Sequence, residues 1–282
     1  MRTRSLNLHR LRTRPSLAKY RKIDLRKTLF LLPNMITLAS IFCGFDSIRT
    51  SAFATGDDDY YRAALLLVFA LLFDTLDGRV ARLTKTQSAF GLQIDSLADV
   101  VSFGVAPGLL VYKWSIGQIE GLGFVASFVF VAAGAIRLAR FNVLSMNTQG
   151  APTKPGKFIV GLPIPGAAGI LMSLVLANHA AGGNLRAPQY AWPIAFVTVL
   201  ASFLMISTVK FRTFKDVRLT PASVALVCFA IGSSAIVSMQ TKPAFVLVWL
   251  LSFYVGIGII ESIFGLSQKW RGVGDKTPPS QQ

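Results

Sequence analysis

Four aspartates stand close together in a part of the chain that is otherwise apolar. Asp74 and Asp77 are three residues apart, and Asp95 and Asp99 are four residues apart. The flanking segments 63–73 and 100–112 consist mainly of Ala, Leu, Val and Phe. Because a carboxylate at the centre of a membrane helix costs at least about 2.5 kcal/mol, four of them in such a setting need a functional reason.

Helical geometry would bring these four carboxylates together. Spacings of three and four residues put each pair on one face of a helix. A short polar turn at about 83–90 makes the two helices antiparallel neighbours, so all four side chains reach a similar depth. Since facing carboxylates repel one another, a cation is expected between them. Oxygen ligands without Cys or His favour Mg²⁺, Mn²⁺ or Ca²⁺ over zinc.

The same stretch contains a longer pattern of fixed residues. It reads D-x-x-D-G-x-x-A-R, then eight residues, then G-x-x-x-D-x-x-x-D. Beyond the aspartates, its fixed positions are Gly78, Ala81, Arg82 and Gly91. This pattern resembles the signature of the CDP-alcohol phosphotransferases, and every fixed position of that signature matches. The resemblance implies a membrane enzyme that acts on a CDP-linked substrate.

The resemblance also assigns roles to these residues. Asp74, Asp77 and Asp95 are expected to bind Mg²⁺ or Mn²⁺, as one ion or two. Asp99 is expected to be the general base for the acceptor hydroxyl and to ligate the metal as well, and no organic cofactor is expected. The residues expected at the nucleotide and its phosphates are Asn34, Asp74, Asp77, Gly78, Ala81, Arg82 and Gly91.

Residue chemistry fits these roles but leaves alternatives open. Small side chains at Gly78 and Ala81 let a nucleotide approach closely, although small residues also serve helix packing in membranes. Arg82 can donate parallel hydrogen bonds to phosphate oxygens, or it can snorkel at a helix end. Asn34 follows Pro33 near the start of the first apolar segment, where it can line a pocket or serve helix packing.

Further segments resemble one branch of the family, the phosphatidylserine synthases. They are 96–107, 137–142 and 161–165, and with the signature the resemblance covers about 29–169. It implies transfer of the phosphatidyl group of CDP-diacylglycerol to the hydroxyl of L-serine by direct displacement, with CMP as the leaving group. The resemblance therefore implies CDP-diacylglycerol and L-serine as substrates, and the expected reaction requires no protein nucleophile.

The candidates for binding the acceptor or the lipid phosphate are Arg137, Arg140 and Asn142. Arg82 belongs to a signature shared by all acceptors, so Arg140 is expected to set the affinity for serine. The two arginines alternatively serve as positive anchors at the membrane surface.

Other functions stay open on the sequence alone. The same chemistry can serve another acceptor, such as glycerol 3-phosphate, choline or inositol phosphate. A different class is a cation-coupled carrier, in which the aspartates would line an ion pathway. A carrier does not account for Gly78, Ala81 and Arg82, and it would not release CMP from CDP-diacylglycerol.

Composition predicts an all-α integral membrane protein. Only 15% of the 282 residues are charged, and the mean hydropathy is +0.54. Apolar segments long enough to span a bilayer predict about eight transmembrane helices. These helices are expected at 29–51, 60–82, 91–114, 119–144, 161–178, 190–209, 221–239 and 243–266. The net charge of +16 is assigned to loops that face anionic lipid, not to nucleic acid.

The chain divides into a membrane domain and two tails. Residues 1–28 are a basic cytoplasmic tail, with an interfacial amphipathic helix expected over 16–28, although a plain basic tail fits as well. Residues 29–266 form the transmembrane catalytic domain, and residues 267–282 a cytoplasmic tail expected to be disordered. Cys43 and Cys228 stand alone in apolar segments, which predicts neither a disulfide nor a zinc site.

The distribution of charge predicts the orientation in the cell (inner) membrane. Most of the 29 Lys and Arg fall in the tails and in the loops after the second, fourth and sixth expected helices. The opposite side holds Arg49, Arg62, Lys113, Arg186 and Lys242. By the positive-inside rule both termini are cytoplasmic, and the aspartates lie at the cytoplasmic face. A homodimer is expected from the family resemblance and from small residues at 256 and 258.

Overall fold

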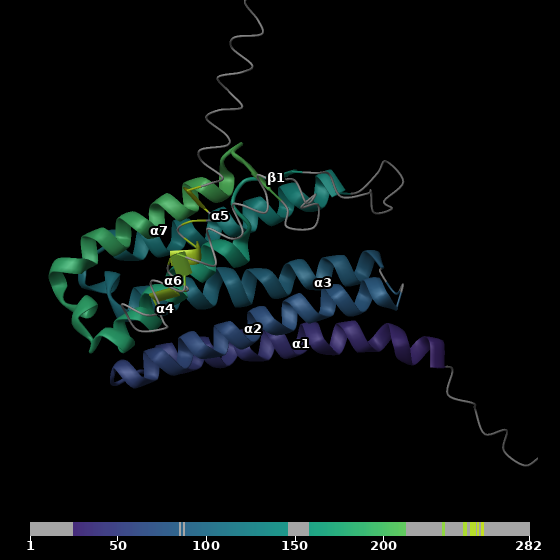
Figure 1. Ribbon diagram of the computed structural model, residues 1–282, viewed down its shortest axis with the longest axis horizontal. Coiled ribbons are helices and arrows are strands. Elements are labelled where there is room, and N and C mark those ends of the chain that lie inside the picture. The colour runs from purple at the N-terminus through teal and green to yellow at the C-terminus, as the bar shows by residue number, and fades with distance from the viewer. Residues whose placement is uncertain are drawn as a thin grey trace, which may run out of the picture.

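The computed structural model describes residues 25–84, 86, 88–145 and 158–212, with isolated positions between 233 and 256. Within these residues the chain is helical except for one pair of short strands (Figure 1). The helices are α1 (Leu25–Ala52), α2 (Asp57–Leu83), α3 (Ala89–Asp99), the π-helix η1 (Val100–Val105), α4 (Ala106–Trp114), α5 (Leu122–Ser145), α6 (Ile164–Ala181) and α7 (Ala191–Ile206). Short 3-10 turns are η2 (Ile116–Gln118), η3 (Asn184–Arg186) and η4 (Pro188–Tyr190).

Four segments of the described chain are long and apolar enough to cross a membrane. They are Ala89–Trp114, Leu122–Leu144, Ile164–Ala181 and Pro188–Ile206. Helices α1 and α2 have similar lengths, 28 and 27 residues, but α2 carries three aspartates in its first turn and two more near its end. The protein is therefore a helical membrane protein, as its composition predicted.

The helices form two groups that meet at a shared core. Helices α1, α2 and α3 lie along one side of the molecule and α5 and α7 along the other, with α4 and α6 between them (Figure 1). Large apolar side chains with almost no exposed surface fill the space between the groups, among them Phe103, Trp114, Phe130, Ile164 and Leu171. Burial of these side chains holds the middle helices in place.

The first six helices expected from the sequence are present, with three differences. The third expected helix contains the π-helix η1, which divides it into α3 and α4. The sixth ends at Ile206 rather than at 209, because the chain there turns extended. The C-terminal tail and residues 1–24 of the basic tail lie outside the described residues. The expected seventh and eighth helices do so as well, apart from isolated helical positions between 233 and 256.

The third difference is a small antiparallel sheet of two short strands, which adds to the all-α fold without changing its class. Strand β1 (Phe158–Val160) pairs with β2 (Lys210–Arg212), with Ile159 opposite Phe211. Gly161 follows β1 with φ +81°, a conformation that residues with a Cβ rarely adopt. A Cβ at this position would also collide with the carbonyl oxygen of Met205. The turn from β1 into α6 therefore requires glycine.

Candidate metal and nucleotide site

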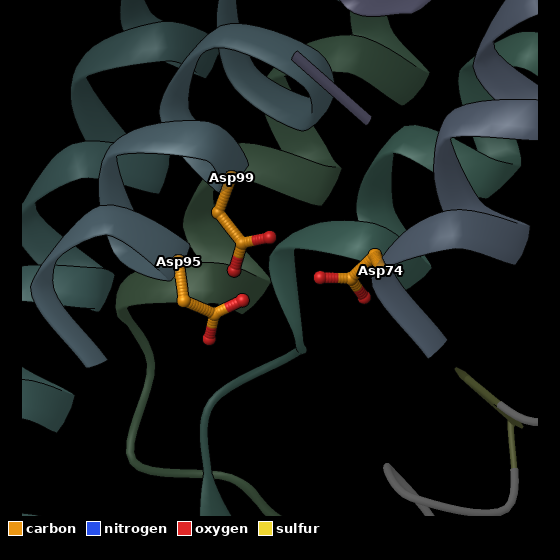
Figure 2. Close-up of side chains that lie close together, drawn as sticks. All are labelled: Asp74, Asp95 and Asp99. Atoms are coloured by element: carbon orange, nitrogen blue, oxygen red, sulfur yellow. The ribbon is translucent and has the colours of Figure 1, made fainter. Parts of the chain in front are cut away.

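Three of the four signature aspartates converge on one point. Asp74 lies on α2, and Asp95 and Asp99 lie one turn apart on α3 (Figure 2). Each offers one carboxylate oxygen, and the three oxygens lie within 4.8 Å of one another. We call these residues the carboxylate triad. The spacing of the aspartates predicted a cluster of all four, and three of them form this group.

The connection between α2 and α3 fixes the depth of the triad. Helix α2 ends at a turn in which the amide N–H of Thr86 donates to the carbonyl of Ala81 at 3.0 Å. Helix α3 then starts at an N-cap, Ser88, whose hydroxyl oxygen accepts from the amide N–H of Gly91 at 2.9 Å. An N-cap of this kind satisfies an amide that would otherwise lack a partner. Helix α3 therefore begins at Ala89 rather than at Gly91, the start expected from the sequence, where the cap Ser88 gave no clear signal.

A π-helix follows directly after Asp99. Turns of this type are wider than α-helical turns and are frequent at functional sites. Within it, the hydroxyl of Ser102 donates to the carbonyl oxygen of Ser40 on α1 at 3.1 Å. The π-helix therefore anchors the end of α3 against α1, next to the residue expected to act as base.

Asp77 is held differently from the triad. It is 5% exposed, and its Oδ2 accepts a hydrogen bond of 2.6 Å from the hydroxyl of Thr37 on α1. Asp77 remains near enough to interact electrostatically with Asp74 and Asp95. The sequence did not mark Thr37 as a site residue, because a threonine in an apolar helix is commonly a packing residue.

The residues at this point suit a divalent cation. In the described part of the chain, Oδ1 of Asp99 is buried and has no hydrogen-bond partner. A buried carboxylate oxygen is costly unless a donor or a cation compensates it. Because Mg²⁺ and Mn²⁺ prefer carboxylate oxygens, the donor set fits these metals.

The other nucleotide candidates lie around the triad at the same end of α2 and α3. A Cβ built on Gly78 would lie 3.5 Å from Nη1 of Arg82, so the exposed arginine folds back over the glycine. A Cβ built on Gly91 would lie 3.9 Å from Oδ1 of Asn34, which brings α1 to the start of α3. Ala81 is half-buried one turn beyond Asp77.

The three acceptor candidates on α5 have separate surroundings. Arg137 is 7% exposed and close enough to Asp99 for an electrostatic interaction. The amide of Asn142 donates to the hydroxyl of Ser96 at 2.9 Å, which ties α5 to α3 beside Asp95.

Arg140 points to a different part of the molecule. Its guanidinium donates to the carbonyl oxygens of Ile206 at 2.9 Å and Val160 at 3.2 Å, and more weakly to those of Met205 and Ser207 at 3.4 Å. The last carbonyls of a helix have no partner within the helix, so Arg140 caps α7 from the neighbouring α5. The expectation that it sets serine affinity stays a prediction, beside this structural role.

Comparison with known proteins adds a family and named relatives. Residues 30–205 match the family model described as CDP-alcohol phosphatidyltransferase. The chain is 39% identical to the CDP-diacylglycerol--serine O-phosphatidyltransferase of Helicobacter pylori strain J99, over 84% of this chain and 92% of the relative. It is 30% identical to the protein of the same name from Methanocaldococcus jannaschii, over 85% and 98%. An archaetidylserine synthase from Methanothermobacter thermautotrophicus is 36% identical over 67% and 72%.

Proposed function

The chain belongs to the CDP-alcohol phosphatidyltransferase family, and from that premise we propose that it transfers the phosphatidyl group of CDP-diacylglycerol to L-serine. The products are phosphatidylserine and CMP. The observation that carries the proposal is the convergence of Asp74, Asp95 and Asp99, at the spacing of the family signature. Serine is proposed as the acceptor because several relatives are named for transfer to serine.

The reaction is a direct displacement at phosphorus. The hydroxyl oxygen of serine attacks the lipid-bearing β-phosphorus of CDP-diacylglycerol, in line with the bond to the leaving group. The new oxygen–phosphorus bond forms as the bond to CMP breaks, and CMP departs with the electron pair. Asp99, whose Oδ1 is buried and has no hydrogen-bond partner among the described residues, accepts the hydroxyl proton as general base.

The signature residues bind the rest of the substrate. Asp74, Asp77, Asp95 and Asp99 would hold the divalent metal, as one ion or two. When bound, Mg²⁺ or Mn²⁺ neutralises charge that develops on the pyrophosphate oxygens. Arg82 is exposed beside Gly78 and can swing onto the phosphates, where its planar fork matches two oxygens.

The structure favours Arg137 over Arg140 as the arginine that meets the acceptor carboxylate or the lipid phosphate. Arg137 is buried within electrostatic range of Asp99, so an anion bound beside the base would meet its charge. Arg140 already donates to four carbonyl oxygens on β1 and at the end of α7. Asn142, paired with Ser96, orients the helix turn that carries Asp95.

The proposed enzyme spans the membrane about eight times, with both termini and the triad on the cytoplasmic side. The support is the charge asymmetry of the loops. Single cysteines placed at the exposed positions Arg79 and Glu120 test it. The Arg79→Cys protein should react with an impermeant thiol reagent only in inside-out vesicles, and the Glu120→Cys protein only in right-side-out vesicles. The reverse pattern would refute the orientation.

A homodimer is also proposed, from family resemblance and from the small residues at 256 and 258. Mass measurement of the purified protein in native-like lipid should give twice the chain mass. A mass of 30.6 kDa, that of one chain, would refute it.

A single assay tests the function. Purified protein in detergent should release CMP from CDP-diacylglycerol only when a divalent metal and an alcohol are both present. In a panel of serine, glycerol 3-phosphate, choline and inositol phosphate, serine should give the highest kcat/KM. Preference for another acceptor would leave the family chemistry intact and overturn serine, whereas no metal-dependent CMP release with any acceptor would overturn the transferase itself.

A further inference from the structure

Helix α1 carries a column of small and hydroxyl-bearing residues on the side that packs against α2 and the π-helix η1. The column follows alternating steps of three and four residues, and all its members are buried: Thr37, Ser40, Gly44, Ser47 and Ser51. Such spacing places side chains along one helix face. Small residues there let the two backbones approach closely, as is common between membrane helices.

Two members of the column bond to the backbone of α2. The hydroxyl of Ser47 donates to the carbonyl oxygen of Ala63 at 2.9 Å, and that of Ser40 donates to the carbonyl oxygen of Ala70 at 3.1 Å. On α1 these donors are seven residues apart, and so are the acceptors on α2. These two bonds therefore fix how far α1 is shifted along α2.

The next hydroxyl group of the column, that of Thr37, bonds to a side chain of α2 instead of a backbone carbonyl. Asp77 follows Ala70 by seven residues, and the hydroxyl of Thr37 lies 2.6 Å from its Oδ2. Thr37 has a single hydroxyl proton, and its other acceptor, the carbonyl of Pro33, is more distant at 3.1 Å. A hydrogen bond to an ionised acceptor is shorter and stronger than one to a neutral acceptor. The hydroxyl of Thr37 therefore donates its proton to the carboxylate of Asp77 rather than to the carbonyl of Pro33.

One oxygen of the Asp77 carboxylate, Oδ2, is therefore hydrogen-bonded to Thr37 on α1. Thr37 and Asp77 are 4% and 5% exposed, so water does not compete for the bond. Among the described residues, the group of three converging oxygens comprises the triad and not Asp77. Asp77 can therefore offer its other oxygen, Oδ1, to a shared metal, in an orientation that the bond to Thr37 helps to fix.

We propose that Thr37 is a positioning residue, which orients Asp77 as a ligand of the divalent cation through the bond to Oδ2. The inference rests on the proposed function, since it assumes that the aspartates bind a metal. Partners that orient metal ligands commonly contribute roughly 10–100-fold to metal affinity or activity. The competing role is that of a packing contact like Ser40 and Ser47, which would leave metal binding unchanged.

The test measures Mn²⁺ binding to the purified full-length protein by electron paramagnetic resonance, without nucleotide or serine. Thr37→Val keeps the shape of the side chain and removes its hydroxyl, whereas Thr37→Ser keeps the hydroxyl. The valine variant should bind Mn²⁺ at least about tenfold more weakly, and the serine variant should stay within about threefold of the wild type. Unchanged Mn²⁺ affinity in the valine variant would overturn the proposal.

Two further variants separate positioning from packing. Ser47→Ala removes an equivalent buried bond at the other end of the column; it should lower thermal stability about as much as Thr37→Val and leave Mn²⁺ binding unchanged. A loss of Mn²⁺ affinity in Ser47→Ala would show that helix packing is responsible. In an Asp77→Asn background, Thr37→Val should cause little additional loss, because the two residues act as a unit. Full additivity would refute the coupling.

The proposed function has its own control in this experiment. Asp95→Asn removes a member of the triad and should abolish high-affinity Mn²⁺ binding. If it does not, the metal site itself is refuted. If Asp95→Asn abolishes binding and Thr37→Val does not alter it, the role of Thr37 alone is refuted.

Discussion

The hydroxyl of Ser102, three residues after the expected general base, donates to the carbonyl oxygen of Ser40 on α1, 62 positions earlier in the chain. At the same place the two backbones nearly touch: a Cβ built on Gly44 would lie 2.8 Å from the Cα of Ser102 and 2.6 Å from its hydroxyl oxygen. The π-helix that follows Asp99 thus packs directly on the glycine of the α1 column.

This contact predicts that Gly44→Ala reduces both stability and activity. The added methyl group must displace the backbone of the π-helix, and overpacking of this kind costs roughly 1–3 kcal/mol. Thermal unfolding in detergent and CMP release measure the two effects. Gly104→Ala is the matched control, since among the described residues a Cβ there would meet only Ile164 Cδ1, at 3.7 Å. Equal behaviour of the two variants would contradict the importance of the close approach.

A second prediction concerns the turn between β1 and α6. Gly161→Ala should lower the melting temperature by more than Gly182→Ala. Both glycines have positive φ, +81° and +91°, so both variants pay roughly 1–2 kcal/mol of backbone strain. Only the Cβ at Gly161 would also collide with Met205 and crowd Arg140, whereas none of the described atoms lies within 4 Å at Gly182. Equal melting temperatures would show that the collision is relieved at no cost.

A third prediction tests the triad. Asp95→Asn should reduce CMP release by at least about 100-fold, because losing a ligand charge should cost at least as much as losing a supporting partner. The protein should still insert and purify. Asp46→Asn is the control, since Asp46 also lies on a membrane helix but pairs with Arg49, away from the triad. Activity of Asp95→Asn near the wild-type level at saturating Mg²⁺ would rule out a ligand role.

The two arginines of α5 give a fourth prediction. Arg137→Lys should raise the KM for serine by at least about tenfold, because an ammonium group cannot reproduce the two parallel hydrogen bonds that a guanidinium donates to a carboxylate. The KM for CDP-diacylglycerol should change much less. Arg140→Lys should instead lower the melting temperature, because an ammonium group cannot reproduce donation to four carbonyls from two nitrogens.

Steady-state kinetics on both substrates and thermal unfolding distinguish the roles of these arginines. A raised serine KM in Arg140→Lys at unchanged stability would support the expectation drawn from the sequence. A raised KM for CDP-diacylglycerol in Arg137→Lys would assign that residue to the lipid phosphate. If neither KM changes in either variant, both arginines are structural.

Most of the helical layout follows from local properties of the sequence. Apolar segments of spanning length mark α5, α6, α7 and the run from α3 to α4, because the backbone in a bilayer must satisfy its own hydrogen bonds. The π-helix within the third expected helix and the β1–β2 pair have no local signal. They depend on contacts between distant parts of the chain, such as Ser102 with Ser40 and Val160 with Lys210.

The chemistry of the site was readable in the sequence for a similar reason. Spacings of three and four residues and a short turn are enough to bring Asp74, Asp95 and Asp99 together, because helix geometry and a brief connection leave few alternatives. The sequence therefore determined that these carboxylates meet and that their oxygen atoms suit a divalent metal, but it did not separate Asp77 from them.

Only the tertiary structure decided how the remaining polar groups are used. Arg137 and Arg140 are three residues apart and look equivalent in the sequence, yet one is buried near Asp99 and the other caps the end of α7. Asp77 looks like its neighbours in the signature, yet it bonds to Thr37. The physical reason is that a hydrogen bond depends on where its partner lies in space, and these partners lie 20 to 67 residues away along the chain.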